Sequence, residues 1–143
     1  MSVQGLDDVL KRLGKFEAEM EQQTKDIVSA TALSIHGHAV KEIQRGKKSG
    51  AIYQRSNKTH RASATGEAPA TDTGALVSSL QLKGAGSTTM YVFTNLLNYA
   101  PFLEFGTSKM GERPFMRPAL QANKAPFEKA VKAMLDNVKR KLN

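Results

Sequence analysis

The chain has no cysteine and no tryptophan among its 143 residues. The absence of cysteine excludes disulfide bonds and thiolate metal ligands. No apolar run approaches the roughly 20 residues that a membrane-spanning helix needs, so we expect no membrane partner. The first residues are polar and acidic where a signal peptide would be apolar, which predicts synthesis in a cytoplasm.

Motifs for catalysis are also missing from the sequence. There is no Gly-x-Ser-x-Gly turn and no glycine pattern that binds phosphate. His36 and His38 are two residues apart, whereas metal ligands on one helical face are three or four apart, and His60 stands alone. Glu104 has no partner residue for hydrolysis. The sequence therefore predicts neither an enzyme nor a cofactor nor a metal site.

Acidic residues are scarce in most of the chain, whose net charge is +8. Residues 1–42 contain seven acids and five bases, but residues 43–143 contain six acids and sixteen bases. This asymmetry favours an anionic partner, either nucleic acid or an acidic protein surface. The other explanation of the asymmetry is that the surplus lysines only keep the protein soluble.

Apolar residues recur at helical spacing from residue 5 to about residue 43, with no proline between them. Such a helix is about 57 Å long, twice the width expected of a compact domain of this size. We expect either a bend near Thr24 or Gly37, or a neighbouring subunit that covers part of the apolar face. The neighbour is the favoured alternative.

Residues 46–74 are predicted to form a long basic loop, here called the arm. The stretch between Ile43 and Gly66 has six bases and no acid, and apolar periodicity stops there. A loop of this length is usually functional, or it is disordered until it meets a partner. These six bases are Arg45, which directly precedes the arm, Lys47, Lys48, Arg55, Lys58 and Arg61, and the first five are possible DNA contacts. Tyr53 and His60 lie among them, where an aromatic ring could stack on a base.

The next segment predicts a short helix and a hairpin. Asp72 or Thr73 is a suitable N-cap for a helix that runs to about Leu82. Residues 88–94 alternate as a strand does, and residues 80–83 could pair with them through a turn at residues 84–86.

Residues 99–120, here called the central segment, are both apolar and rich in proline. Residues 98–105 predict one or two helical turns, and Phe115 with Met116 predicts a short edge strand. Pro118 suits the first position of a last helix, which Pro126 must kink or restart. Glu112 is expected to pair with neighbouring Arg113 or with solvent.

These elements predict a single α+β domain over residues 1–143. A long N-terminal helix and a C-terminal helix would pack on a small antiparallel sheet, with the long basic arm at residues 46–74 extending from it.

Three sequence segments together resemble the tail-component family of tailed bacteriophages, whose members are also described as head–tail joining, neck or tail-completion proteins. The segments are residues 49–53 with 59–70, residues 72–80, and residues 99–107 with 113–119, which include Glu-Phe-Gly-Thr at 104–107 and Arg-Pro-Phe-Met-Arg-Pro-Ala at 113–119. The resemblance covers about residues 46–122. Thr65, where similar proteins often have proline, and Pro126 depart from the pattern.

The resemblance implies a structural virion protein, made in the bacterial cytoplasm, that forms a homo-oligomeric ring at the head–tail junction around the DNA channel. Six subunits are favoured over twelve, because the tail is six-fold. Its partners would be connector or head-completion proteins, tail-tube proteins, and double-stranded DNA that passes without sequence recognition. The position, tail-capping or neck-girdling, stays open.

For the central segment we expect Glu104 to accept hydrogen bonds from the backbone or from arginine, with Arg113 and Arg117 docking that turn or a neighbouring subunit. The alternative places both arginines on DNA phosphates. The residues expected at a subunit or partner interface are Tyr53, Arg61, Glu67, Glu104, Phe105, Gly106, Arg113, Phe115 and Arg117. The alternative function is a standalone basic protein that binds nucleic acid without sequence specificity.

Overall fold

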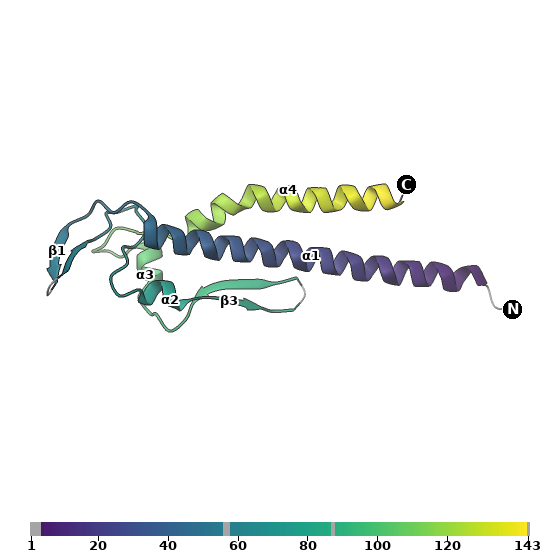
Figure 1. Ribbon diagram of the computed structural model, residues 1–143, viewed down its shortest axis with the longest axis horizontal. Helices are drawn as coiled ribbons and strands as arrows, with labels where there is room; N and C mark the ends of the chain where they lie inside the picture. Colours follow the sequence, from purple (N-terminus) through teal and green to yellow (C-terminus); the bar gives the residue numbers. More distant parts are fainter. Residues whose placement is uncertain (1–3, 56–57, 87, 143) are drawn as a thin grey trace.

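One helix forms the axis of the molecule in the computed structural model, which describes residues 4–55, 58–86 and 88–142 (Figure 1). Helix α1 (Gln4–Arg45) runs for 42 residues without a break, about 63 Å at 1.5 Å per residue. The predicted helix is confirmed, and it is interrupted at neither Thr24 nor Gly37. A glycine inside a helix costs about 1 kcal/mol relative to alanine, which tertiary packing can offset.

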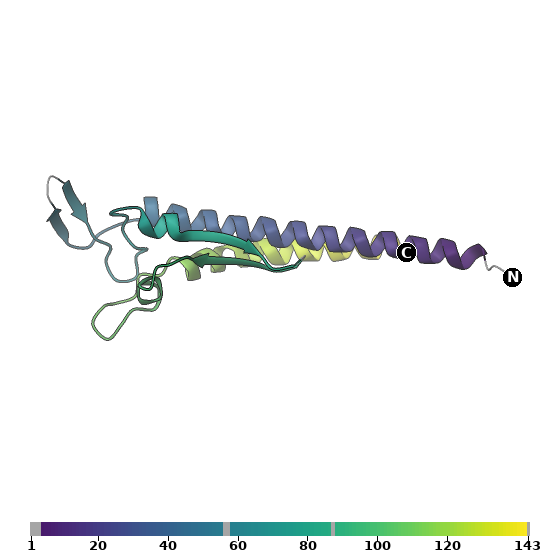
Figure 2. The same cartoon turned by 90° about the horizontal axis from the view of Figure 1, so that it is seen from below.

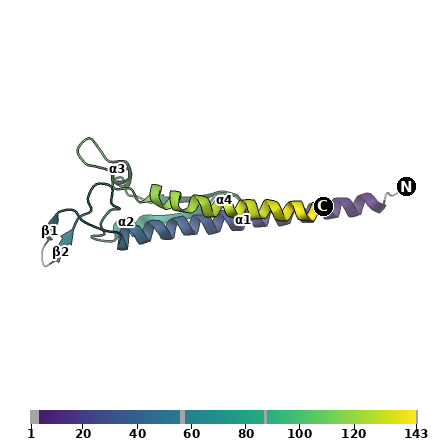
Figure 3. The same ribbon diagram turned by 90° about the horizontal axis from the view of Figure 1, so that it is seen from above.

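Helix α4 (Met116–Leu142) lies antiparallel to α1 (Figures 1 and 3). Three contacts fix this arrangement: Ser34 with Asn123, Thr24 with Met134, and Glu19 with Lys141. The residue numbers of these contacts fall along α1 as they rise along α4, and the two residue numbers of each pair add up to between 157 and 160. The register is therefore constant along the whole shared length of the two helices.

Pro126 lies inside α4, where it removes one backbone donor. The helix continues through it, so of the two expected alternatives, a kink or a restart, the restart does not occur. The ribbon of the first, green part of α4 is inclined to the rest (Figure 1), as a proline in a helix commonly causes.

A β-hairpin follows a short helix and lies along α1 (Figure 2). Strand β3 (Leu80–Gly84) pairs antiparallel with β4 (Met90–Thr94), with Leu82 opposite Val92. The predicted hairpin is confirmed. The preceding helix α2 (Ala75–Ser79) is shorter than predicted, because Leu80 already belongs to β3.

The predicted N-cap of α2 is wrong. Gly74 occupies that position with a φ of 78° and makes no side-chain cap hydrogen bond. The Thr73 hydroxyl, one residue earlier, accepts a 3.4 Å hydrogen bond from the N–H of Ala75. A glycine reaches this left-handed conformation at little cost, so the chain turns sharply into α2 at Gly74.

The arm contains a second β-hairpin, where the sequence predicted no regular structure. Strand β1 (Ile52–Arg55) pairs antiparallel with β2 (Lys58–Arg61), with Tyr53 opposite His60. The ladder continues beyond the strands, because the Gly50 N–H donates to the Ala62 carbonyl at 3.0 Å and the Ala62 N–H donates to the Ala51 carbonyl at 2.9 Å. The hairpin forms the end of the molecule opposite the N-terminus (Figure 1).

The core sits at the C-terminal end of α1, and each of the other described helices contributes residues to it. Its buried apolar residues come from α1, α2, β3, α3 (Ala100–Phe105) and the start of α4. They are Ala39, Ile43, Leu76, Leu80, Ala100, Phe115 and Ala119. The predicted α+β class is confirmed, although the expected small sheet is two separate two-stranded sheets.

The central segment differs from prediction at its second half. Helix α3 confirms the helical turns expected at residues 98–105. Phe115 and Met116 form no edge strand: Phe115 precedes α4 with 1% of its surface exposed, and Met116 is the first residue of α4. Pro118 is consequently the third residue of the helix, where its missing N–H still costs no helical hydrogen bond.

Replacing Ile43 by alanine tests the position of the core. Ile43 is fully buried, so Ile43→Ala is expected to lower the free energy of unfolding by about 2–5 kcal/mol in urea denaturation. The matched control is Leu33, which lies on the same helix but is 62% exposed. Leu33→Ala should change the free energy of unfolding by less than about 1 kcal/mol. Equal losses from the two variants would contradict this core.

Candidate functional site

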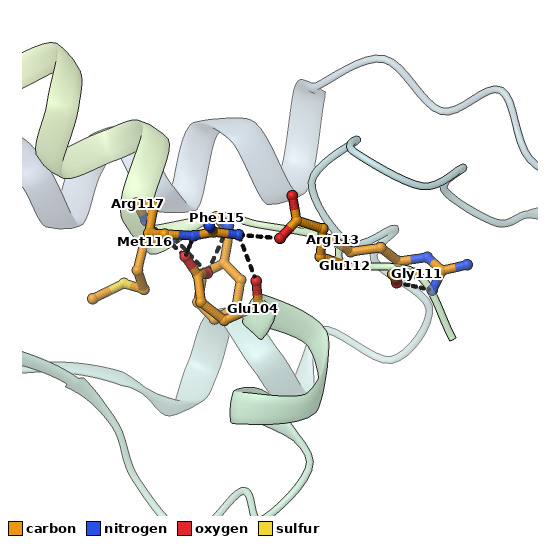
Figure 4. A network of polar contacts seen from close by, with 7 residues as sticks. All are labelled: Glu104, Gly111, Glu112, Arg113, Phe115, Met116 and Arg117. Atoms are coloured by element: carbon orange, nitrogen blue, oxygen red, sulfur yellow. Dashed lines mark hydrogen bonds and ion pairs between the residues drawn. The ribbon is translucent and has the colours of Figure 1, made fainter. Parts of the chain in front are cut away.

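The carboxylate of Glu104 caps the start of α4 (Figure 4). Its Oε2 accepts hydrogen bonds from the N–H groups of Phe115 at 2.9 Å and Met116 at 3.0 Å, and its Oε1 accepts one from the N–H of Arg117 at 2.8 Å. The first N–H groups of a helix have no partner within it, and the helix dipole favours a negative charge there. A side chain of α3, remote in sequence, thus does the work of a local N-cap.

Arg117 completes this junction from the other side. Its Nε lies 3.3 Å from Glu104 Oε1, and its Nη2 donates to the Glu104 carbonyl oxygen at 3.0 Å and to Glu112 Oε2 at 2.5 Å. The hydrogen bond to Glu112 is the main cause that raises the pKa of the guanidinium. The guanidinium also lies over the ring of Phe105, 5.6 Å from its centre, which adds a cation–π attraction.

Glu104 is 5% exposed, and all these partners surround it. The expectation that it accepts backbone and arginine hydrogen bonds is confirmed, and Arg117 docks the turn as expected. Glu112 pairs with Arg117, so its predicted pairing with Arg113 is wrong. The reason is the turn before α4, which places Glu112 beside the Arg117 side chain (Figure 4).

Gly106 permits the turn that follows α3. Its φ is 74°, and a Cβ there would lie 2.8 Å from the Met110 carbonyl oxygen and 2.9 Å from the Glu112 nitrogen. The backbone returns through a bridge between Thr107 and Met110. No other residue type fits this position, and the close return brings residues 111–116 back over α3.

Arg113 joins the central segment to the arm rather than to Glu104. Its Nε donates to the Ser63 carbonyl at 3.2 Å and its Nη1 to the Gly111 carbonyl at 3.2 Å. The Gly66 N–H donates to the Glu112 carbonyl at 2.8 Å, a second link between the same two segments. Arg113 and Ser63 line part of a cleft of about 320 Å³ that is also bordered by Tyr99 and Met110.

Glu67 closes the base of the arm. Its carboxylate accepts hydrogen bonds from the Ser49 hydroxyl at 2.6 Å, the Ser49 N–H at 2.8 Å and the Ala64 N–H at 2.9 Å. These bonds, that from the Ser49 hydroxyl above all, lower the pKa of Glu67 to about 2. The first and last parts of the arm are thereby tied together.

The basic residues of the arm have different surroundings. Arg45, Lys47, Lys58 and Arg61 are exposed, as is Tyr53 on β1. Lys48 instead turns inward, and its Nζ donates to the carbonyls of Glu42 at 3.1 Å and Ala68 at 2.7 Å; burial lowers its pKa. Lys48 therefore acts as a brace between α1 and the arm. Arg55 ends β1, but its side chain lies outside the described part of the structure.

Within the described residues, no group of three or more histidine, aspartate or glutamate side chains could hold a metal ion. His36 faces the carbonyl of Leu80 at 3.3 Å, and His38 lies 3.9 Å from Glu42 on the same helix. Across the part of the chain that the structure describes, no helix combines the length and the apolar character that crossing a membrane requires.

The sequence-predicted interface residues form two groups. Glu104, Phe105, Gly106, Phe115 and Arg117 meet at the start of α4, and Arg113 links them to the end of the arm near Glu67. Tyr53 and Arg61 lie apart from these, on the hairpin. Sequence reasoning missed the inward brace of Lys48, which no local pattern indicates because both of its acceptors are backbone carbonyls.

Comparisons of this chain with protein-family models, with curated proteins and with solved structures find no match.

Glu104→Gln tests the junction. The amide keeps the shape but loses the charge, and it turns an NH₂ group toward N–H donors, so the free energy of unfolding should fall by about 3 kcal/mol. The matched control is Glu112→Gln, which removes the exposed partner of Arg117 and should cost less than about 1 kcal/mol. Urea denaturation measures both, and a loss at Glu112 as large as that at Glu104 would refute the assigned roles.

The pKa of Glu67 predicts a pH dependence. Its folded-state pKa of about 2 lies below the ordinary value of 4.5, so the ionised carboxylate stabilises the fold above about pH 4.5, and this contribution is lost as the pH falls toward 2. Glu67→Gln should therefore lower the Tm at pH 7, and its difference from the unsubstituted chain should shrink below pH 4.5. Glu128→Gln, the same exchange at an exposed position of α4, should show no such convergence.

Proposed function

We propose that this chain is a non-enzymatic structural subunit of a ring at the head–tail junction of a long-tailed bacteriophage. One observation carries the proposal: the apolar face of α1 continues past the end of α4, and among the described residues no other part of the chain covers it. Leu6, Val9, Leu10 and Leu13 are all at least 50% exposed. A contiguous apolar surface on a helix is typical of a protein that completes its burial against another molecule.

The second support is the place of the sequence motif in the fold. The Glu-Phe-Gly-Thr and Arg-Pro-Phe-Met-Arg-Pro-Ala segments resemble the phage tail-component family, and in this chain they form the Glu104 junction. The glutamate, the glycine and the arginines of these segments hold α3, α4 and the arm together. Residues used in this way suit a protein whose function is to hold a shape within an assembly.

The third support is the exposed positive charge at the arm. Arg45, Lys47, Lys58 and Arg61 present ammonium and guanidinium groups to solvent. Contacts to phosphates carry no base information, so bases near a channel allow DNA to pass whatever its sequence. In the proposed ring the chain binds its own copies, with connector or head-completion proteins on one side and tail-tube proteins on the other.

A standalone nucleic-acid-binding protein is the second candidate. It is favoured by the hairpin of β1 and β2, on which the exposed ring of Tyr53 lies beside exposed bases. Two-stranded ribbons of this kind can enter the major groove of DNA, and aromatic rings can stack on unpaired bases.

Light scattering coupled to size exclusion separates the two candidates. A ring subunit should have a molar mass several times 15.6 kDa without DNA, at both low and high salt, because apolar contacts are little weakened by salt. Six copies are the expected number. A chain that stays at 15.6 kDa and binds duplex DNA with an affinity that falls steeply with salt would favour the second candidate and refute the first.

A further inference from the structure

The exposed end of α1 and a groove elsewhere on the same molecule are complementary in length, polarity and charge. We infer that the two bind each other between copies of this chain, head to tail. This inference rests on the proposed ring, and it names the surfaces that would join one subunit to the next.

The first surface is the N-terminal end of α1, residues 4–15, here called the overhang. The α1–α4 register pairs residues whose numbers add to 157–160, so the overhang has no α4 residue opposite it. Figure 1 shows α1 extending past the last turn of α4. Leu6 and Leu13 precede Met20 by fourteen and seven residues, which places them on the face that α4 covers further along. The overhang thus continues an apolar interface whose other half is missing.

The second surface is a groove of about 550 Å³ between α1 and α4. Its walls are Thr31 and Ile35 from α1, and Leu120 and Phe127 from α4. Leu120 is 60% exposed and Phe127 38% exposed, so large apolar side chains face solvent along its length. The groove could accept the apolar face of one more helix, which would then form a three-helix bundle with α1 and α4.

The two surfaces match in length. Leu6 and Leu13 are seven positions apart on α1, and Leu120 and Phe127 are seven positions apart on α4. Each distance is about 10.5 Å at 1.5 Å per residue. An overhang laid in the groove would therefore place its leucines against apolar side chains from end to end.

The charges also match. The charged residues that line the groove are Arg117 and Lys124, both basic. At 100° per residue, Glu17, just beyond the overhang, lies in line with its apolar stripe, whereas Lys11 and Lys15 point to the other side of α1. Asp7 and Arg12 border the stripe on opposite sides. The contact would bring the carboxylate of Glu17 toward the basic groove and direct Lys11 and Lys15 away from it.

The overhang cannot reach the groove of its own chain. Leu10 in the overhang and Thr31 in the groove are 21 residues apart on one continuous helix, about 32 Å. The groove must then be filled by another molecule. A second copy of this chain has the matching overhang, because every copy carries both surfaces. A contact between two different surfaces is heterologous, and repeated contacts of that kind close into a ring if the rotation between subunits allows it.

Two charge substitutions in the full-length chain test this contact. Leu10→Glu places a charge on the overhang, and Leu120→Glu places one in the groove; both residues are exposed, so both variants should keep their helical circular dichroism. Each is expected to reduce the molar mass from several chains to one chain, measured by light scattering. Leu33→Glu, an equally exposed position of α1 outside both surfaces, should leave the oligomer unchanged.

Mixing the two variants gives the decisive result. The Leu10→Glu chain keeps its groove and the Leu120→Glu chain keeps its overhang, so an equimolar mixture should form one-to-one dimers and no ring. A mixture that stays at one chain mass overturns the inference. Loss of the oligomer with Leu10→Glu but not with Leu120→Glu also overturns it, because overhangs would then pair with each other.

The same measurement separates this inference from the proposed function. An oligomer that survives both substitutions overturns the overhang–groove contact and leaves a ring built through other surfaces. An unsubstituted chain that is monomeric at every concentration overturns both.

Discussion

A single carboxylate at the start of α4 determines how the halves of this molecule meet. Glu104 belongs to α3, yet it satisfies the first N–H groups of α4 and pairs with Arg117 in the first turn of that helix. An isolated buried carboxylate would be costly, but this one has four donors around it. Because α4 then runs along α1 as far as Glu19, the orientation set at Glu104 is transmitted to the whole helical pair.

The arm depends on the same region through a second set of polar contacts. Arg113 and the Glu112 carbonyl hold the end of the arm, Glu67 ties that end to Ser49, and Lys48 braces the start of the arm against α1. Most acceptors in this set are backbone carbonyls or a carboxylate. The arm is thus ordered by hydrogen bonds and charge, with little apolar burial, and the hairpin that it carries remains exposed.

The sequence predicts the parts of this fold that periodicity governs. Helix α1, the β3–β4 hairpin, α3 and the C-terminal helix all follow from apolar spacing or from turn residues. The role of Glu104 as a hydrogen-bond acceptor was also predictable, since proline, glycine and arginine around it indicated a rigid turn. The hairpin of β1 and β2 was not, because its strands are exposed and show no alternation. Nor was the partner of Glu112, because which arginine it meets depends on a turn that Gly106 alone permits.

Because α1 extends far beyond its buried end, a small tilt there becomes a large displacement of its tip. The helix is held in the core at Ile43, and the overhang lies tens of ångströms away along a stiff rod. A tilt of about 5° at the core would displace the far tip by about 5 Å. In the proposed ring, slight repacking around the anchored end would move the tip relative to the next copy, so rings of different diameter could form through the same two surfaces.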